Sequence, residues 1–279
     1  MTNLTLDRPS TERLQETLAD RDVVPFIGVY DVFSATLAAQ RHDTLFVSGF
    51  GFAASHYGLP DVGFVTWSDI VGFVQRLRAA LPETKLLVDI DDGYVDTDVA
   101  VHAAATLERL GAWGVVLEDQ ARPRRCGHFG GKRILPVKDY LAKLRRVLDA
   151  RRDLVVVART DASDPAEALD RVAAYAEAGA DAVLIDGLKD LSTLGEARRR
   201  AGVPVVFNQI AGGKSPACSL DELAAFGASL AIYSTPCLFA AQQAIVRALD
   251  GIEADGGRLP TGGVGVPDCT AVVKDNLAS

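Results

Sequence analysis

The stretch Gly114-Val-Val-Leu-Glu118-Asp119-Gln120 is a short apolar, β-branched run that ends abruptly in acidic and amide side chains. Similar runs lie on either side of it in the chain, Leu86-Leu-Val-Asp89 before it and Leu154-Val-Val-Val-Ala-Arg159 after it. Longer segments of helical periodicity separate these runs. Each return to the next strand therefore passes through a crossover helix, which implies parallel pairing of the strands.

The same alternation continues through most of the chain. The predicted strands are Val24–Val29, Thr44–Ser48, Leu86–Asp89, Gly114–Glu118, Leu154–Thr160, Ala182–Ile185, Val203–Phe207 and Leu230–Tyr233. The predicted helices are Val32–Gln40, Thr66–Leu81, Asp96–Leu110, Val137–Arg151, Asp164–Ala178, Leu191–Ala201, Ser219–Phe226 and Ala240–Asp250. Eight strand–helix units in strict order favour a closed (β/α)₈ TIM-type barrel of the α/β class over an open sheet.

We expect residues 1–279 to form a single domain, with a barrel core over about residues 22–250. A helix over Thr11–Asp20 is expected to cover the bottom of the barrel. Residues 251–279 are expected to form a C-terminal tail or helical arm, because Asp255–Ser279 contains Gly256, Gly257, Gly262 and Gly263 with Pro260 and Pro267.

Composition limits the partners. The formal net charge of −8 argues against nucleic acid or anionic lipid as the main partner. The four cysteines are dispersed without a C-x-x-C pair, so neither a disulfide framework nor a structural zinc site is indicated. The first ten residues carry no apolar signal region, and no apolar run approaches the ~18 residues that cross a bilayer. We therefore expect a cytoplasmic protein.

Polar side chains gather where the predicted strands end, which is where barrel enzymes carry their chemistry. Asp89 ends the third strand and Asp91 follows it on the same side of the extended chain, and Glu118 ends the adjacent fourth strand. Hard oxygen ligands of this kind suit Mg²⁺ or Mn²⁺. The alternative is an ordinary acidic turn at Asp91-Asp92-Gly93, since Asp and Gly favour turns.

A basic, glycine-bearing loop, Arg122–Lys132, follows the fourth strand and is long enough to close over a substrate. Its basic residues surround Cys126, a setting that lowers a thiol pKa and suits an acid or base. His128 is a weaker catalytic candidate that could orient the loop. The alternative is a solvated loop with an incidental cysteine.

Three other strand ends carry candidate ligands for a substrate anion. Arg159 could hold a carboxylate bidentately, or form a structural ion pair with Asp161 or Glu118. Asn208 could donate to a substrate oxygen or satisfy a loop carbonyl. Ser48 with the Gly49 and Gly51 amides could form an anion-binding nest.

In order along the chain, several motifs occur together. They are Val29-Tyr30-Asp31-x-x-Ser34-Ala35, Ser48-Gly49, Gly58-x-Pro60-Asp61, Asp89-x-Asp91-x-Gly93-Tyr94, Glu118-Asp119-Gln120, Arg125-Cys126-Gly127-His128, Ala158-Arg159-Thr160-Asp161-Ala162 and Ala178-Gly179-Ala180-Asp181. Over roughly residues 20–250 the chain resembles the isocitrate lyase/phosphoenolpyruvate mutase superfamily.

The resemblance implies a barrel with Mg²⁺ near Asp89, Asp91 and Glu118, catalytic roles for Cys126, Arg159 and His128, and a homotetramer that swaps a C-terminal helix. It implies that Ser48 and Gly49 bind a pyruvyl-type carboxylate, that Asp61 belongs to the metal's outer shell and that Arg159 clamps the substrate. The substrate-binding set implied in this way is Tyr30, Ser48, Gly49, Phe50, Asp61, Gly127, Arg159, Asp186 and Asn208.

Within the superfamily, the motif around Cys126 is closest to the 2-methylisocitrate and dimethylmalate lyase branch, because phosphonopyruvate hydrolases and phosphoenolpyruvate mutases generally lack this cysteine. Two positions depart from the lyase pattern. Position 186 is Asp, where lyases tend to have Glu and phosphonate enzymes His. The segment from Asn208 to Pro216 keeps a Gly-Lys-Ser-Pro element but lacks the acidic residue that often precedes it.

These observations support three hypotheses about function. The first is a Mg²⁺-dependent carbon–carbon lyase that cleaves a 2-hydroxy or 2-substituted dicarboxylate or tricarboxylate through an enolate, with Cys126 as the acid. The second keeps the barrel but changes the reaction to P–C bond chemistry, as a mutase or hydrolase, or to oxaloacetate decarboxylation or hydrolysis. The third is a non-catalytic binding barrel, which loss of the acidic residues would favour and their presence disfavours.

Overall fold

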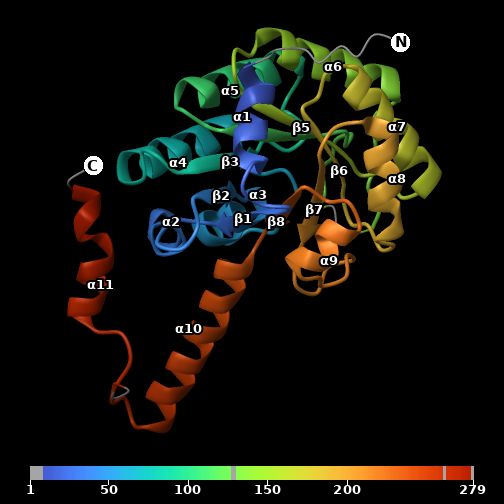
Figure 1. Cartoon of the computed structure of the whole chain (residues 1–279). Coiled ribbons are helices and arrows are strands. Elements are labelled where there is room, and N and C mark those ends of the chain that lie inside the picture. The colour runs from blue at the N-terminus through green and yellow to red at the C-terminus, as the bar shows by residue number, and fades with distance from the viewer. Residues whose placement is uncertain (1–8, 127–129, 260–261, 278–279) are drawn as a thin grey trace.

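The computed structural model describes residues 9–126, 130–259 and 262–277 of the chain. Eight parallel strands close into a barrel in chain order, each strand pairing with the next and β8 pairing with β1 (Figure 1). The strands are β1 (Val24–Val29), β2 (Thr44–Val47), β3 (Lys85–Asp89), β4 (Gly114–Glu118), β5 (Val155–Thr160), β6 (Ala182–Ile185), β7 (Val205–Gln209) and β8 (Leu230–Tyr233). The predicted (β/α)₈ barrel is confirmed.

Helices surround the barrel. They are α1 (Pro9–Leu18), α2 (Val32–Ala39), α3 (Gly49–Phe52), α4 (Trp67–Ala80), α5 (Thr97–Arg109), α6 (Val137–Ala150), α7 (Pro165–Glu177), α8 (Ser192–Ala201), α9 (Leu220–Ala225), α10 (Pro236–Ala254) and α11 (Val266–Val273). The bounds of the predicted helices agree with the structure to within four residues, whereas no bounds were predicted for α3 or α11. Helix starts follow the sequence: Asp164 caps α7 before Pro165, and Ser219 and Glu222 form the capping box of α9.

The apolar side chains form two layers, one inside the barrel and one between the strands and the helices. Phe26 and Trp113 pack in the interior with ring centroids 5.0 Å apart. Leu14 of α1 belongs to the same interior cluster, and Thr17 of α1 accepts a hydrogen bond of 3.2 Å from the Trp113 indole. The N-terminal helix therefore closes one end of the interior, as expected, and leaves the opposite end for the polar residues.

The last two helices extend beyond the barrel, with α10 pointing away from it in Figure 1. Neither α10 nor α11 buries a residue completely. Ile245, Val246 and Leu249 of α10 are all more than half exposed. The segment beyond α11 is held by a hydrogen bond of 2.9 Å from Asn276 to Thr36 of α2. Among the described residues, no helix has the length and apolar character needed to span a membrane.

Candidate active site

Strand alternation places the polar residues of the site. On seven strands an interior apolar residue is followed two positions later by a polar residue that the same alternation directs to the barrel mouth. The pairs are Phe46 with Ser48, Leu87 with Asp89, Val116 with Glu118, Val157 with Arg159, Leu184 with Asp186, Val206 with Asn208, and Ile232 with Ser234. Because all strands are parallel, these side chains meet at one end of the barrel.

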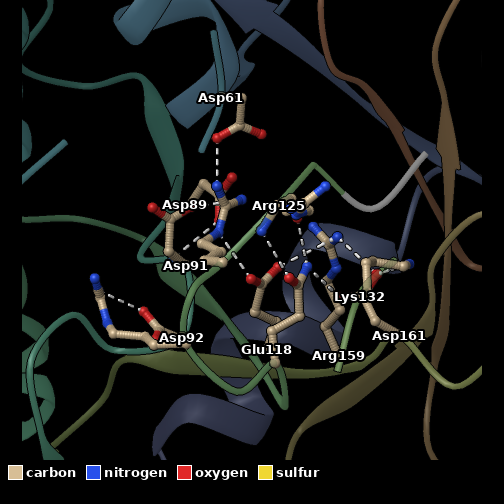
Figure 2. A network of polar contacts seen from close by, with 12 residues as sticks. Asp61, Asp89, Asp91, Asp92, Glu118, Arg125, Lys132, Arg159 and Asp161 are labelled. Carbon is tan, nitrogen blue, oxygen red and sulfur yellow. Dashed lines mark hydrogen bonds and ion pairs between the residues drawn. The ribbon is translucent and has the colours of Figure 1, made fainter. Parts of the chain in front are cut away.

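Three carboxylates on one side of the mouth contact a single guanidinium, that of Arg124. Its Nε donates to Glu118 Oε1 at 2.8 Å, its Nη2 lies 2.8 Å from Asp91 Oδ1, and its Nη1 pairs closely with Asp61. Asp89 completes this acidic side, and its Oδ1 accepts a hydrogen bond of 3.1 Å from the Asp91 amide. Figure 2 shows Asp61, Asp89, Asp91 and Glu118 facing this network from different segments of the chain.

These acidic residues were predicted to share a divalent cation. Among the described residues, no three Asp, Glu, His or Cys side chains are arranged to hold a metal ion as they stand. The structure thus brings Asp89, Asp91 and Glu118 into one network, but the network is centred on Arg124. The direct sharing of an ion by the three predicted ligands stays a prediction that requires Arg124 to move.

The acidic residues nevertheless fit a hard cation. The carboxylates of Asp61, Asp89, Asp91 and Glu118 are buried oxygen ligands. Among the described residues, no hydrogen-bond donor is aligned with Asp91 Oδ1 or Glu118 Oε2. Burial raises the pKa of the Asp91 and Glu118 carboxyls well above the usual values, although the charge of Arg124 lowers both. A divalent ion would stabilise the charged forms that burial disfavours.

Gly49 is pressed against the acidic side. A Cβ on this residue would lie 3.2 Å from Asp91 Oδ1 and 3.3 Å from Asp89 Oδ2, so these two oxygens face the same small space. The turn after β3 is strained, because Asp91 and Tyr94 adopt positive φ angles of 51° and 70°. Gly93 in the same turn has φ 81° and no room for a Cβ, which would lie 2.5 Å from the Ala100 Cβ.

The opposite side of the mouth is built on Arg159. Its Nη2 lies 3.2 Å from Glu118, 3.1 Å from Asp161 and 2.8 Å from Asp186. Lys132 pairs with Asp161 at 2.5 Å. Both structural partners suggested from sequence are therefore real, but the buried Arg159 Nε has no aligned acceptor among the described residues. Part of this guanidinium remains available to a ligand.

A chain of hydrogen bonds continues from Arg159 around the mouth. Asn208 Nδ2 donates to Asp186 Oδ1 at 2.8 Å, and Ser234 donates to Asn208 Oδ1 at 2.6 Å. Asp186 is thereby fixed by two donors, from β5 and from β7. Asn208 therefore contacts a carboxylate and a hydroxyl of the mouth, and its donation to a substrate oxygen stays a prediction.

A cavity of about 30 Å³ lies between these two sides. Eight predicted site residues line it, together with Arg124 and Ser234: they are Ser48, Phe50, Asp61, Asp89, Cys126, Arg159, Asp186 and Asn208. Cys126 is 5% exposed, and its amide donates to Asp61 O at 3.1 Å. Tyr30, Gly49, Asp91 and Glu118 do not line the cavity, and the roles of Gly127 and His128 fall outside the described residues.

One prediction about this region needs correction. The Ser48 hydroxyl accepts the Gly51 amide at 3.0 Å and caps α3, so that amide is not free to form an anion nest. No helix was predicted from Gly49 to Phe52, nor the π-helix Ala53–Tyr57 that follows it, because glycines and aromatic residues are weak helix formers. Ser48 itself still lines the cavity.

Two residues of the site, Ser234 and Arg124, were not predicted from the sequence. Ser234 follows β8, and the strand-end rule used for six other strands would have found it. Arg124 was considered only as part of the basic surroundings of Cys126. Its contact with three carboxylates depends on the path of a loop, for which the sequence has no periodic signal.

Comparisons with known proteins agree with this geometry. The family model for phosphoenolpyruvate phosphomutase matches residues 14–253. A 2-methylisocitrate lyase from Aeropyrum pernix is 32% identical over 232 residues, covering 82% of this chain and 74% of the relative.

Two solved structures are similar over nearly the whole chain. A 2,3-dimethylmalate lyase, described as a PEP mutase/isocitrate lyase superfamily member, has a TM-score of 0.89 at 27% identity, with 96% of this chain and 93% of that chain covered. Oxaloacetate acetylhydrolase in complex with 3,3-difluorooxalacetate has a TM-score of 0.88 at 28% identity, with 97% and 98% covered. With its barrel, its polar mouth and these matches, the chain belongs to the phosphoenolpyruvate phosphomutase family and is an enzyme of the isocitrate lyase/PEP mutase superfamily.

Proposed function

We propose that the enzyme is a carbon–carbon lyase that cleaves a 2-hydroxy or 2-substituted dicarboxylate or tricarboxylate, as a 2-methylisocitrate lyase does. The observation that carries the proposal is the place of Cys126. It lines the same cavity as Arg159 and Asp89, so its thiol lies in one small space with a cationic clamp and an acidic cluster. The similar lyases named above support the same reaction class.

The residues divide the reaction between them. Cleavage turns the carbon that bears the hydroxyl into a carbonyl, as the hydroxyl proton passes to a carboxylate of the acidic side that lines the cavity. It leaves the electron pair of the broken bond on the neighbouring carbon, as an enolate of the other carboxylate. That carbon needs a proton, which the Cys126 thiol is placed to give. Arg159 holds the carboxylate of the keto-acid half through its Nε, which donates no hydrogen bond to any described residue.

Asp89, Asp91 and Glu118 would hold Mg²⁺ or Mn²⁺, with Asp61 close by. When bound, the cation supplies positive charge where the oxygens of the substrate become more negative. Asp186 is held by Arg159 and Asn208 at the cavity wall, and being shorter than Glu it leaves more room for the substituent of the substrate.

The test is Cys126→Ser. Turnover of the cleaved substrate should fall by about 10²–10⁴-fold, the usual contribution of a positioned acid. Calorimetric titration with Mg²⁺ should give the same dissociation constant as the wild type, because Cys126 is not among the proposed ligands. Near-normal turnover in this variant would remove Cys126 from the mechanism.

A second candidate function is chemistry on oxaloacetate or on a P–C bond. The similarity to the oxaloacetate acetylhydrolase structure favours chemistry on oxaloacetate, and Asp186 matches neither the Glu of the lyases nor the His of the phosphonate enzymes. A panel of 2-methylisocitrate, 2,3-dimethylmalate, oxaloacetate and phosphonopyruvate separates the two. Turnover of oxaloacetate or phosphonopyruvate without turnover of either lyase substrate would replace the first proposal.

We also propose that the enzyme is a homotetramer in which α10 packs on another copy. The apolar side chains of α10 that are exposed in the single chain, Ile245, Val246 and Leu249, support this assembly. Light scattering should report four chains, and Leu249→Asp should lower that mass. The cytoplasmic location stays a prediction.

A further inference from the structure

Arg124 is the most heavily paired cation at the barrel mouth, and the proposed reaction gives it no role. Its side chain is 1% exposed. Each of its three nitrogens contacts a different carboxylate: Nε contacts Glu118, Nη1 contacts Asp61 and Nη2 contacts Asp91. These acids come from the end of β4, the segment before α4 and the turn after β3. One side chain from the loop after β4 therefore joins three separate parts of the acidic side.

Arg124 occupies oxygens that a divalent cation would need. Its guanidinium lies within 2.8 Å of one oxygen of Asp91 and one of Glu118, which are two of the three proposed ligands. A guanidinium and a divalent cation at the same oxygens would repel each other strongly in a buried site. The two cations therefore exclude one another.

Arg124 satisfies these acids only in part. Asp91 Oδ1 lies 2.8 Å from Arg124 Nη2 and Glu118 Oε2 lies 3.2 Å from Arg159 Nη2, but among the described residues neither oxygen accepts a well-aligned hydrogen bond. A planar guanidinium has fixed donor directions, whereas a metal ion can be approached by oxygens from several sides. The acidic side is thus neutralised by Arg124 but still presents oxygen lone pairs suited to a smaller, more highly charged cation.

The position of Arg124 also sets the size of the cavity. Arg124 and Cys126 both line it, and the Cys126 amide is bonded to the carbonyl of Asp61, whose carboxylate pairs with Arg124. The loop is thereby attached twice to the same residue. The remaining space of about 30 Å³ is too small for a dicarboxylate. A substrate therefore requires this attachment to change.

We propose that Arg124 is the built-in counter-cation of the metal-free enzyme, which a divalent cation displaces from Asp61, Asp91 and Glu118 when it binds. Metal binding then releases the loop segment around Arg124 and Cys126 and enlarges the cavity, so the cation binds before the substrate. This inference rests on the metal site of the proposed function and adds a residue that sets its affinity.

The test compares Mg²⁺ binding to chelator-treated proteins by calorimetry. Arg124→Met keeps the length of the side chain and removes its charge, so it should bind Mg²⁺ at least about tenfold more tightly than the wild type and melt at a lower temperature without metal. Arg124→Lys keeps a charge without the three-way contact and should lie between them. Arg125→Met removes the neighbouring, exposed arginine and should match the wild type.

A second measurement needs only the wild type, so it applies even if Arg124→Met fails to fold. Hydrogen exchange of peptides covering residues 121–126 should become faster when Mg²⁺ alone is added, because the Cys126 amide loses its bond to Asp61. Equal or weaker Mg²⁺ binding by Arg124→Met, or slower exchange in this loop, would overturn the role of Arg124. Failure of Mg²⁺ to bind to any of the four proteins would instead remove the metal site of the proposed function, and this inference with it.

Discussion

Glu118 and Asp119 are consecutive residues at the end of β4, both buried and both acidic, yet their surroundings are opposite. Strand alternation turns Glu118 into the barrel mouth and Asp119 toward the surrounding helices. Glu118 pairs with Arg124 and Arg159, but its Oε2 accepts no well-aligned hydrogen bond from the described residues. Asp119 receives four hydrogen bonds, from the Thr160 hydroxyl at 2.6 Å, the Asp161 amide at 2.9 Å, Arg171 at 3.1 Å and the Tyr175 hydroxyl at 2.7 Å.

The difference shows how a structural carboxylate can be told from a functional one. A buried acid whose lone pairs are filled by the protein has no capacity left for a ligand, and it holds its neighbours in place. A buried acid that is only partly satisfied is costly to the fold and remains available to a cation. Substitutions at the two positions should therefore have different effects, on stability at Asp119 and on binding at Glu118.

The largest effect is expected for Asp119→Ala. It would leave Arg171 and two hydroxyls without their buried partner, so the free energy of unfolding should fall by about 3–5 kcal/mol. Urea denaturation of the metal-free protein measures this. Asp98→Ala, which removes a carboxylate that is 81% exposed, is the matched control and should change stability by about 0.5 kcal/mol or less. Equal losses in the two variants would contradict the structural role of Asp119.

Asp161 is the intermediate case, because it lies at the mouth but is fully paired. Burial alone would raise its pKa, but Arg159 and Lys132 beside it hold the pKa well below its usual range. A lowered pKa in the folded state stabilises the protein above the unfolded pKa of about 3.9, and this stabilisation is lost as the pH falls below that value. Asp161→Asn should therefore cost about 2 kcal/mol near neutral pH, the usual contribution of hydrogen bonds to charged groups.

The pH dependence distinguishes this charge effect from a packing defect. Urea midpoints of the wild type and Asp161→Asn should differ near neutral pH and converge as the pH falls below about 4. The Asp98→Asn variant should follow the wild type throughout. A difference that stays constant down to about pH 3 would mean that the charge of Asp161 is not what stabilises the fold.

The strand-end residues could be predicted because they follow from two periodicities. Once the apolar runs are assigned to parallel strands, the residues two positions beyond an interior side chain must meet at the mouth, as Asp89, Glu118, Arg159, Asp186 and Asn208 do. The eight strands were predicted for the same reason, since each combines β-branched residues with a crossover helix of sufficient length.

The remaining features depend on contacts that no local pattern encodes. Arg124 reaches Asp61 across 63 positions of sequence, and only the folded loop brings them together. The Gly51 amide donates to Ser48 because the chain enters α3 directly after β2. The sequence Gly49-Phe-Gly-Phe52 does not predict a helix there. Sequence identified which residues gather at the mouth and suggested two partners for Arg159, but the contacts of Arg124 had to come from the structure.

The smallest change in stability is expected for Glu118→Gln. The substitution removes one of three negative charges that surround Arg124 and relieves a carboxyl whose pKa is raised well above its usual value by burial. Arg124 would keep Asp61 and Asp91 as partners, so the free energy of unfolding without metal should change by about 1 kcal/mol or less. The affinity for Mg²⁺ should nevertheless fall by about 10–100-fold, as when a group that supports a metal is lost. Thermal melting with and without Mg²⁺ shows both results in one experiment, since a bound ion raises the melting temperature of the wild type and should barely raise that of the variant. A strongly destabilised variant that still responds to Mg²⁺ would mean that Glu118 is a structural acid like its neighbour Asp119.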